Sequence, residues 1–324
     1  MQIPARIAVI GVGHLGQHHA RIVHNLKNAQ LVAVVDTDPL RGNEIARQLG
    51  VPHFTTLEEV QSPLDAVSIA TPTISHSEIA SAALERGCHV FIEKPITRTV
   101  EEARALIDLA ENKGRIIQVG HIERFNSAVL DLKKFLDNPL FIECHRLGPF
   151  APRVKDIGVV KDLMIHDLDL ILSLVESEVL SVEAVGIPVL TRFEDIANAR
   201  LRFANGCIAN LTCSRVTPEQ MRKIRFFQSD AYLSLDYQLQ QLQIYRKIPA
   251  QDGSPPSIDR QILQMEKGNA LERELEAFVG AILNGTPPVV TGRDGMKALA
   301  LAQEISDQIH SRKEILHHLS SASQ

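Results

Sequence analysis

The sequence contains no tryptophan, few aromatic residues of any kind (4%) and only four cysteines among 324 residues. The cysteines have neither the C-x-x-C spacing of a metal or redox site nor the density of a disulfide framework. We therefore interpret them as buried thiols in a reducing compartment. The shortage of aromatic rings argues against a stacking cleft for large free oligosaccharides.

Long apolar stretches and an excess of positive charge are also missing. No apolar run approaches the length of a membrane span, and residues 1–6 lead into a strand without a signal-peptide core. The formal net charge of −5 gives no basic footprint for nucleic acid. We therefore expect a cytoplasmic protein with no membrane or nucleic-acid partner. The chain length predicts two domains, and the 44% hydrophobic content is ample for their cores.

What the sequence does contain, at its start, is a glycine-rich turn. The apolar run at residues 7–10 leads directly into Gly11-Val12-Gly13-His14-Leu15-Gly16, and a helix-compatible segment follows to about residue 26. In a strand–turn–helix unit, Gly11 permits the tight turn, Gly13 lets the backbone approach a pyrophosphate and Gly16 lets the helix pack on the strand. The phosphates would lie at the helix N-terminus, where free N–H groups and the helix dipole favour anions.

A carboxylate follows at the spacing that a dinucleotide site requires. The apolar strand at residues 31–35 ends in Asp36, twenty residues after Gly16. Asp36 can accept hydrogen bonds from both hydroxyls of an adenosine ribose, and it would repel a 2′-phosphate. We therefore predict NAD as the cofactor, although Arg41 lies near enough in sequence to weaken the preference over NADP. The alternative is a βαβ unit in which the glycines only make a turn and Asp36 begins another.

Strands and helices alternate regularly up to residue 121. This pattern predicts a parallel, doubly wound sheet, and hence a Rossmann dinucleotide-binding domain over residues 1–121. Ligands bind such sheets beyond the carboxyl ends of the strands. The strand ends expected to line this crevice are residues 11–16, Asp36, Thr71–Pro72, Glu93–Pro95 and Gly120–His121.

Residues 122–324 have a different pattern and form the predicted C-terminal substrate and oligomerisation domain. Long stretches of β character follow one another there, and Asn205-Gly206 is a strong hairpin signal. We expect an α+β domain with a large, mostly antiparallel open sheet, whose free face would support a homodimer or homotetramer. An amphipathic segment covers residues 126–136. Helices are predicted at residues 161–175, 269–284 and 293–312, the last two able to pack back on the Rossmann domain.

Two groups of residues could carry proton chemistry. Lys94 ends a buried-looking strand, where it could hydrogen-bond a substrate hydroxyl and stabilise alkoxide character as hydride leaves. On a helix, Asp162, His166 and Asp169 would be neighbours, and an imidazole beside a carboxylate suits a general base. Simpler interpretations stay open, namely a surface lysine before a proline turn and a polar helix face with a structural histidine. No metal site is predicted, because no cysteine or second histidine completes the group nearby.

In combination these motifs resemble one protein family. The glycine fingerprint, Thr71-Pro72-x-x-x-His76, Glu93-Lys94-Pro95 and Asp162-x-x-x-His166-x-x-Asp169 are similar in order and spacing to the Gfo/Idh/MocA oxidoreductases, over essentially the whole chain. The resemblance implies that Lys94 polarises the substrate hydroxyl, His166 is the general base and Asp162 orients them. The motif and the resemblance together predict these cofactor-binding residues: Gly11, Gly13, His14, Leu15, Gly16, Asp36, Thr71, Pro72, His76, Glu93 and Lys94.

A narrower resemblance concerns the substrate. Gly120-His121-Ile122-Glu123-Arg124-Phe125-Asn126 is similar to a segment of UDP-N-acetylglucosamine 3-dehydrogenases, a branch that makes 3-keto and then 3-amino sugars for surface glycolipids. The implied activity is NAD-dependent oxidation of a secondary hydroxyl, at C3 of the nucleotide sugar. One departure is Gly158-Val159-Val160-Lys161, where the family often has a glycine cluster. The predicted substrate-binding residues are Arg124, Asn126, Arg153, Asp162 and His166.

Several basic residues would suit the pyrophosphate of such a sugar. Arg124, Arg146, Arg153 and Lys155 lie close together in sequence, and arginine binds phosphate through bidentate hydrogen bonds, although a solvated loop is the alternative. Two other functions stay open, a dehydrogenase of a free polyol or aldose and a non-catalytic NAD-binding sensor. The retention of both Lys94 and His166 argues against the sensor, because sensing requires neither proton-handling group.

Overall fold

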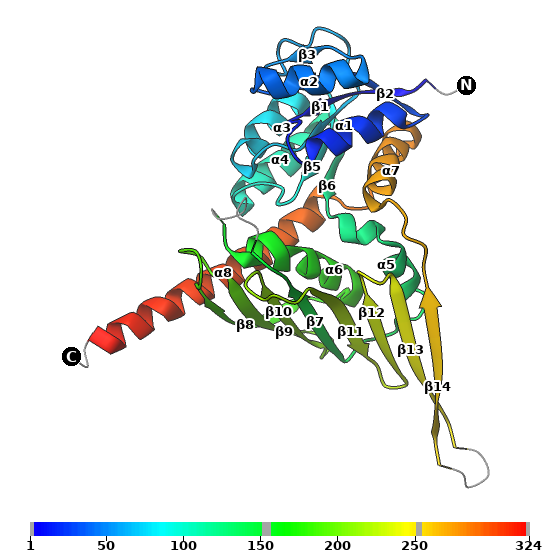
Figure 1. Cartoon of the computed structure of the whole chain (residues 1–324), viewed down its shortest axis with the longest axis vertical. Coiled ribbons are helices and arrows are strands. Elements are labelled where there is room, and N and C mark those ends of the chain that lie inside the picture. Colours follow the sequence, from blue (N-terminus) through cyan, green and yellow to red (C-terminus); the bar gives the residue numbers. More distant parts are fainter. Residues whose placement is uncertain (1–2, 151–156, 251–254, 322–324) are drawn as a thin grey trace. The chain divides into compact units, whose positions relative to one another are not determined.

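The structure is a computed structural model that describes residues 3–150, 157–250 and 255–321, with side chains up to residue 311. The chain divides into two compact units (Figure 1). Unit 1 comprises Met1–Phe125 and Asn269–Leu299, and unit 2 comprises Asn126–Gly268 and Ala300–Gln324. Among the described residues, no helix is both long and apolar enough to cross a membrane.

Within its described residues, unit 1 contains a six-stranded sheet in the order β3-β2-β1-β4-β5-β6. Every pair of neighbouring strands in it is parallel, which confirms the predicted Rossmann arrangement. The strands are β1 (Ala5–Ile10), β2 (Ala29–Val35), β3 (His53–Phe54), β4 (Ala66–Ile69), β5 (His89–Glu93) and β6 (Ile117–Gly120).

Helices cover both faces of this sheet. The apolar side chains of α1 and α7 pack on one face, and those of α3 and α4 on the other. Local signals set the helix ends: Thr99 Oγ1 accepts a hydrogen bond from the Glu102 N–H at the start of α4, and Gly114 ends that helix with φ of 62°. The helices are α1 (Gly16–Asn25), α2 (Pro39–Leu49), η1 (Thr73–Ser75), α3 (His76–Glu85), α4 (Val100–Lys113), η2 (Ile122–Phe125) and α7 (Ala270–Asn284), with the start of α8 (Gly292–Ser321).

The second segment of unit 1 completes the sheet. Phe278 of α7 stacks edge-to-face on Phe91 of β5, with ring centroids 5.7 Å apart. The side-chain amide of Gln118 donates to Glu274 O at 2.8 Å. The Val119 N–H donates to Val290 O at 3.1 Å, so the chain between α7 and α8 covers the free edge of β6.

Unit 2 contains an eight-stranded sheet in the order β14-β13-β12-β11-β7-β10-β9-β8. Among its described strand pairs only β7 and β10 are parallel, which confirms the expected mostly antiparallel sheet. The Asn205-Gly206 hairpin joins β9 to β10, with φ of 89° at Gly206. The strands are β7 (Phe141–Leu147), β8 (Val179–Ile187), β9 (Ile196–Phe203), β10 (Ile208–Ser214), β11 (Met221–Phe227), β12 (Ala231–Asp236), β13 (Gln241–Ile248) and β14 (Ser257–Gln264).

The helices of unit 2 differ in detail from those expected. Within the amphipathic segment at residues 126–136, the α-helical part is α5 (Ser127–Leu132). The helix predicted at residues 161–175 begins as a π-helix, Val160–Met164, and becomes α-helical only in α6 (Ile165–Val175). Strand β14 was not predicted, because its exposed residues 257–264 lack a repeating apolar pattern.

Candidate functional site

The glycine-rich turn has the geometry that its sequence predicts. Gly11 has φ of 80°, and a Cβ there would lie 2.7 Å from Thr71 Cγ2. A Cβ on Gly16 would lie 1.7 Å from Gly11 O, so the helix and the turn can meet only without side chains. Gly13 faces open space, since no described atom outside its chain neighbours would lie within 4 Å of its Cβ. This cradle fits the close approach of a pyrophosphate.

The start of α1 can receive an anion. Among the described residues no side chain caps this helix and no acidic residue lies in its first turn. Gly13, His14 and Leu15 are exposed just before it. The backbone N–H groups and the positive end of the helix dipole therefore fit a phosphate, as the sequence predicts.

Asp36 stabilises the same turn. Its Oδ2 accepts a hydrogen bond from the Val12 N–H at 2.7 Å, and its Oδ1 accepts one from the Asp38 N–H at 2.9 Å. Arg41 donates from Nε to Val12 O at 3.0 Å and from Nη2 to Gln17 Oε1 at 2.7 Å. Arg41 therefore braces the loop, which reduces its availability for a 2′-phosphate.

Thr71, Pro72 and His76 form a connected corner beyond β4. His76 is only 1% exposed, and its ring nitrogens lie 2.9 Å from Thr71 O and 3.0 Å from Pro95 O. Burial lowers the pKa of His76, although these two carbonyls favour the protonated ring. A neutral ring can donate to only one of them. His76 thus ties the loops after β4 and β5 together, and its contact with the cofactor stays a prediction.

Glu93 and Lys94 end strand β5. The Lys94 N–H donates to Glu93 Oε2 at 3.2 Å, and Glu93 as a whole is only 8% exposed. Behind it lies a residue that sequence reasoning missed, His19 of α1, whose Nε2 is 3.2 Å from Glu93 Oε1. The available signal was the position of His19 three residues after Gly16, on the helix face that packs on the sheet.

The parallel sheet brings these elements to one edge of unit 1. The glycine turn follows β1, Asp36 follows β2, the Thr71 corner follows β4, and Lys94 follows β5. The carboxyl ends of parallel strands lie on the same edge, which is the ligand-binding edge of such folds.

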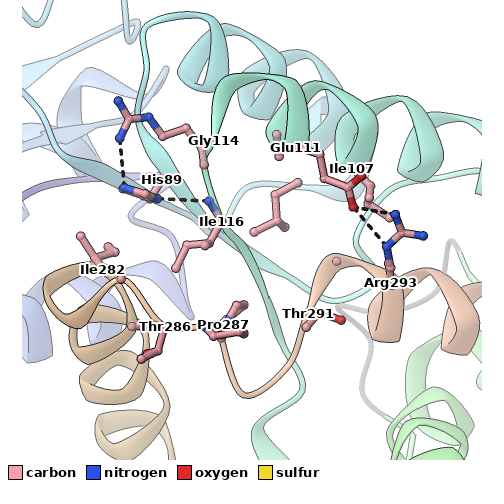
Figure 2. A pocket seen from close by; sticks show the side chains of 17 residues that line it. His89, Ile107, Glu111, Gly114, Ile116, Ile282, Thr286, Pro287, Thr291 and Arg293 are labelled. Atoms are coloured by element: carbon pink, nitrogen blue, oxygen red, sulfur yellow. Dashed lines mark hydrogen bonds and ion pairs between the residues drawn. The ribbon is translucent and has the colours of Figure 1, made fainter.

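A cavity of about 460 Å³ lies at the opposite edge, by the first residues of β5 and β6 (Figure 2). His89, Ile107 and Ile282 line it, and the ion pair of Glu111 with Arg293 lies at its border. None of the predicted site residues lines this cavity. It is therefore separate from the glycine turn.

In unit 2 the π-helix carries Asp162, and the first turn of α6 carries His166. Both side chains are partly buried. The sequence assumed a regular α-helix through both residues, whereas Val160–Met164 is a π turn, which holds more residues than an α-helical turn; the pairing of Asp162 with His166 stays a prediction. π-Helical turns are rare and are frequent at functional sites. Within the described residues, no three His, Cys, Asp or Glu side chains are grouped so as to hold a metal ion.

Gly158, just before the π-helix, is required by its surroundings. A Cβ there would lie 1.9 Å from Glu194 Oε1. The Val159 N–H also donates to Glu194 O at 2.8 Å, so the segment packs closely on the chain two residues before β9. Residue 158 therefore has a steric reason to be glycine.

Arg146 does not belong to the phosphate-binding group, so that prediction was wrong. It is 3% exposed, and its Nε and Nη2 each donate to Asp167 at 2.7 Å. Its guanidinium also lies 5.5 Å from the ring centroid of Tyr237. The pair joins β7 to the first turn of α6. Asp169, expected to accompany His166, is itself buried.

The predicted substrate-binding residues lie in different places. Arg124, in η2 of unit 1, is 8% exposed, and its Nη2 lies 3.9 Å from Asp294 Oδ1. Asn126 begins unit 2, where its Oδ1 accepts the Ala128 N–H at 3.0 Å and caps α5. Arg153, like Lys155, lies outside the described residues. Lys94 belongs to unit 1 and His166 to unit 2, so their meeting around a substrate stays a prediction.

Comparison with known proteins accounts for both units. Residues 5–121 match the Gfo/Idh/MocA oxidoreductase family with its NAD-binding Rossmann fold, and residues 136–234 match a Gfo/Idh/MocA C-terminal domain. The chain belongs to this family. It is an NAD-dependent oxidoreductase that acts on CH–OH groups. The family and the cofactor predicted from sequence are thereby confirmed.

Within the Gfo/Idh/MocA family the chain is similar to enzymes with different substrates. It is 38% identical over 304 residues to UDP-N-acetylglucosamine 3-dehydrogenase of Acidithiobacillus ferrooxidans, covering 94% of this chain and 96% of that one. A solved structure of that enzyme gives a TM-score of 0.90 over 95% of this chain and 98% of its own. The scyllo-inositol 2-dehydrogenase (NAD⁺) of Bacillus subtilis is 32% identical over 237 residues, 67% of this chain and 69% of that one.

Proposed function

We propose that the protein oxidises the C3 hydroxyl of UDP-N-acetylglucosamine with NAD. The observation that carries this proposal is the 38% identity to a UDP-N-acetylglucosamine 3-dehydrogenase over nearly the full length of both chains. The product would be a 3-keto nucleotide sugar, the precursor of a 3-amino sugar.

The proposed chemistry divides between the two units. Bound NAD would supply the acceptor for the hydride that leaves the carbinol carbon. The Lys94 ammonium donates a hydrogen bond to the reacting oxygen and stabilises its developing negative charge. His166 takes the hydroxyl proton, and Asp162 orients the imidazole. After both transfers the products are a ketone, the reduced cofactor and one proton held on His166.

The nucleotide part of the substrate gives a direct test. With NAD, UDP-N-acetylglucosamine should be oxidised while free N-acetylglucosamine shows a lower kcat and not only a higher KM. The reason is that contacts to the remote diphosphate orient the sugar. Reduced-cofactor fluorescence follows both reactions. Equal kcat for the free and the nucleotide sugar would contradict the proposal.

A substitution of Arg124 tests whether this basic residue binds the diphosphate of the substrate. Arg124→Ala should lower kcat/KM for the nucleotide sugar by about ten- to a hundred-fold, the scale of one charge-assisted hydrogen bond. Arg115→Ala is the matched control, because Arg115 is exposed and lines the opposite edge of the same unit. Since Arg124 is also near Asp294, the thermal midpoint of the variant must be measured. An unchanged kcat/KM would remove Arg124 from the substrate site.

A second candidate is a polyol dehydrogenase of the inositol type. It is favoured by the Bacillus enzyme above and by an inositol 2-dehydrogenase of Rhizobium meliloti, 28% identical over 330 residues. Turnover of myo- or scyllo-inositol, with none of UDP-N-acetylglucosamine, would select this function. Turnover of neither, with tight NAD binding, would favour the sensor.

We also propose that the chain forms a homodimer or homotetramer through the sheet of unit 2. In β7, β11, β12 and β13, buried residues alternate with partly exposed ones over at least five consecutive residues, and four of the partly exposed ones form a row across these adjacent strands. Ring centroids are 5.3, 5.0 and 5.5 Å apart in the order Phe141, Phe227, Tyr232, Tyr245. Sedimentation equilibrium tests this, with Tyr232→Asp expected to weaken the oligomer. A monomeric wild-type protein would contradict it.

A further inference from the structure

We propose that His19 is a positioning residue for Lys94, acting through Glu93. This inference rests on the proposed role of Lys94 in the reaction. His19 lies outside the glycine fingerprint, and none of the motifs discussed above includes it. Its place in the structure, buried behind the end of β5, carries the proposal.

His19 joins three elements of unit 1. It lies in α1 and is 0% exposed. Its Nδ1 is 2.9 Å from the hydroxyl of Ser68 in the middle of β4, and its Nε2 is 3.2 Å from Glu93 Oε1 at the end of β5. Its ring also packs edge-on against Phe91, with centroids 5.4 Å apart. The imidazole therefore cannot turn without losing packing on β5.

The Glu93 carboxylate is held on three sides. Oε1 faces His19 Nε2, and Oε2 accepts the Lys94 N–H at 3.2 Å. On the third side lies Gly120 of β6, where a Cβ would be 2.9 Å from the carboxylate. The carboxylate thus has one well-defined position, and that position is tied to the backbone from which the Lys94 side chain departs.

An alternative is that His19 only fills space in the core. Burying a histidine, a serine hydroxyl and a carboxylate together is unfavourable compared with apolar side chains unless all are satisfied. The polar atoms of this group form a line that leads from Ser68 through His19 to Glu93 and ends at Lys94. This series of polar contacts ends at Lys94, the proposed catalytic residue, which a space-filling role for His19 would not require.

The protons in this line can be placed. Nε2 is buried 3.2 Å from Glu93 Oε1, where the described atoms give it no aligned hydrogen-bond partner, so this contact is a charge–dipole approach; a hydrogen on Nε2 makes it attractive, whereas a lone pair would repel the carboxylate. In the neutral ring, Nδ1 then accepts the Ser68 hydroxyl proton, which fixes the tautomer. Such a support for a reacting group matters because a displacement of about 1 Å can cost about a hundred-fold in rate.

Two substitutions separate the contact of His19 with Ser68 from its contact with Glu93. In His19→Asn the amide replaces Nδ1, so contact with Ser68 is kept and contact with Glu93 is lost. In His19→Gln the longer side chain brings an N–H donor to the place of Nε2, next to Glu93. We expect His19→Asn to lower the single-turnover rate of NADH formation by about ten- to a hundred-fold, and His19→Gln to restore it to within about threefold of wild type.

Cofactor affinity distinguishes positioning from structural damage. The NAD dissociation constant and the thermal midpoint should be similar in both His19 variants, since neither touches the glycine turn. His24→Asn, on the exposed face of the same helix, is the matched control and should match wild type in all measurements. Ser68→Ala provides a milder variant, expected to lower the rate in the same direction, and it decides the question if His19→Asn fails to fold.

The outcomes separate this inference from the proposed function. Equal rates for His19→Asn and His19→Gln would overturn the role of His19, as would a loss of NAD binding parallel to the loss of rate. If Lys94→Met is slow while His19→Asn is as fast as wild type, the reaction stands and the inference fails. If Lys94→Met keeps the wild-type rate, the proposed function of Lys94 fails instead.

Discussion

The two units present their candidate residues in different ways. In unit 1 the residues follow successive parallel strands, so topology alone places them on one edge of the sheet. In unit 2 the large sheet contributes support, and the candidate proton-transfer residues Asp162 and His166 lie on one short helical segment with a π turn. We infer that unit 1 determines how the cofactor is held, and that unit 2 supplies the proposed general base, while Arg124 of unit 1 is proposed to help bind the substrate.

The most severe test of this division concerns the chemical step. Lys94→Met in unit 1 and His166→Ala in unit 2 should each lower turnover by about 10²–10⁴-fold, the scale of lost acid–base catalysis. NAD binding should be nearly unchanged in both, which fluorescence titration measures. Loss of NAD binding in His166→Ala would show that unit 2 also holds the cofactor. Normal turnover in either variant would exclude that residue from the reaction.

A second test compares one ion pair in each unit. Arg146→Met leaves Asp167 buried without its partner in unit 2, and should lower the free energy of unfolding by about 3–5 kcal/mol. Arg6→Met breaks the pair with Asp65 in unit 1, where both side chains are partly exposed, and should cost much less. Urea unfolding measures both. Equal losses would contradict the assignment of Arg146 to the core.

Asp36 tests cofactor choice. Asp36→Ala should lower the affinity for NAD by about tenfold, because the hydrogen bonds to the ribose are lost. It should also reduce the difference between the affinities for NAD and NADP. Because Asp36 also accepts the Val12 N–H, Asp36→Asn is the control that retains one acceptor oxygen. Equilibrium titration with both cofactors measures the effect. Tighter binding of NADP than of NAD by the wild-type protein would contradict the prediction.

The smallest expected effect is a different response of the two units to acid. Burial lowers the pKa of His76 in unit 1, so the unfolded chain takes up this proton first and stability falls as the pH drops below about 6.5. Burial alone would raise the pKa of Asp195 in unit 2. Hydrogen bonds from three backbone N–H groups and from Arg215 outweigh it, so stability is lost only as the pH falls below about 3.8.

The two residues can be separated by substitution. Between about pH 7 and pH 5, the thermal midpoint of His76→Gln should decrease less than that of the wild-type protein. The thermal midpoint of Asp195→Asn should differ from wild type in its pH dependence mainly at lower pH. The negative charge of Glu93 acts on His76 and favours the protonated form of the imidazole. A pH dependence of His76→Gln equal to that of wild type would contradict the assignment.

The sequence anticipated unit 1 far better than unit 2. Gly11, Gly16 and Asp36 have local roles that spacing reveals, because each depends on a turn or a strand end a few residues away. The roles of His19 and Arg146 depend on partners far away in the sequence, Glu93 of β5 and Asp167 of α6, and no local pattern indicates such pairings. The π turn was also beyond prediction, since its residues have an ordinary helical composition.

Helix α7 has a consequence for the order in which the chain is synthesised. Its Phe278 covers Phe91, and Val290 just beyond it covers the edge of β6, yet both leave the ribosome long after the strands that they protect. Until then, the nascent Rossmann sheet has an open edge and a bare apolar patch, which are the features that cause aggregation. A fragment that ends at residue 125 should therefore precipitate or require chaperones, and addition of a peptide spanning residues 269–299 should rescue it.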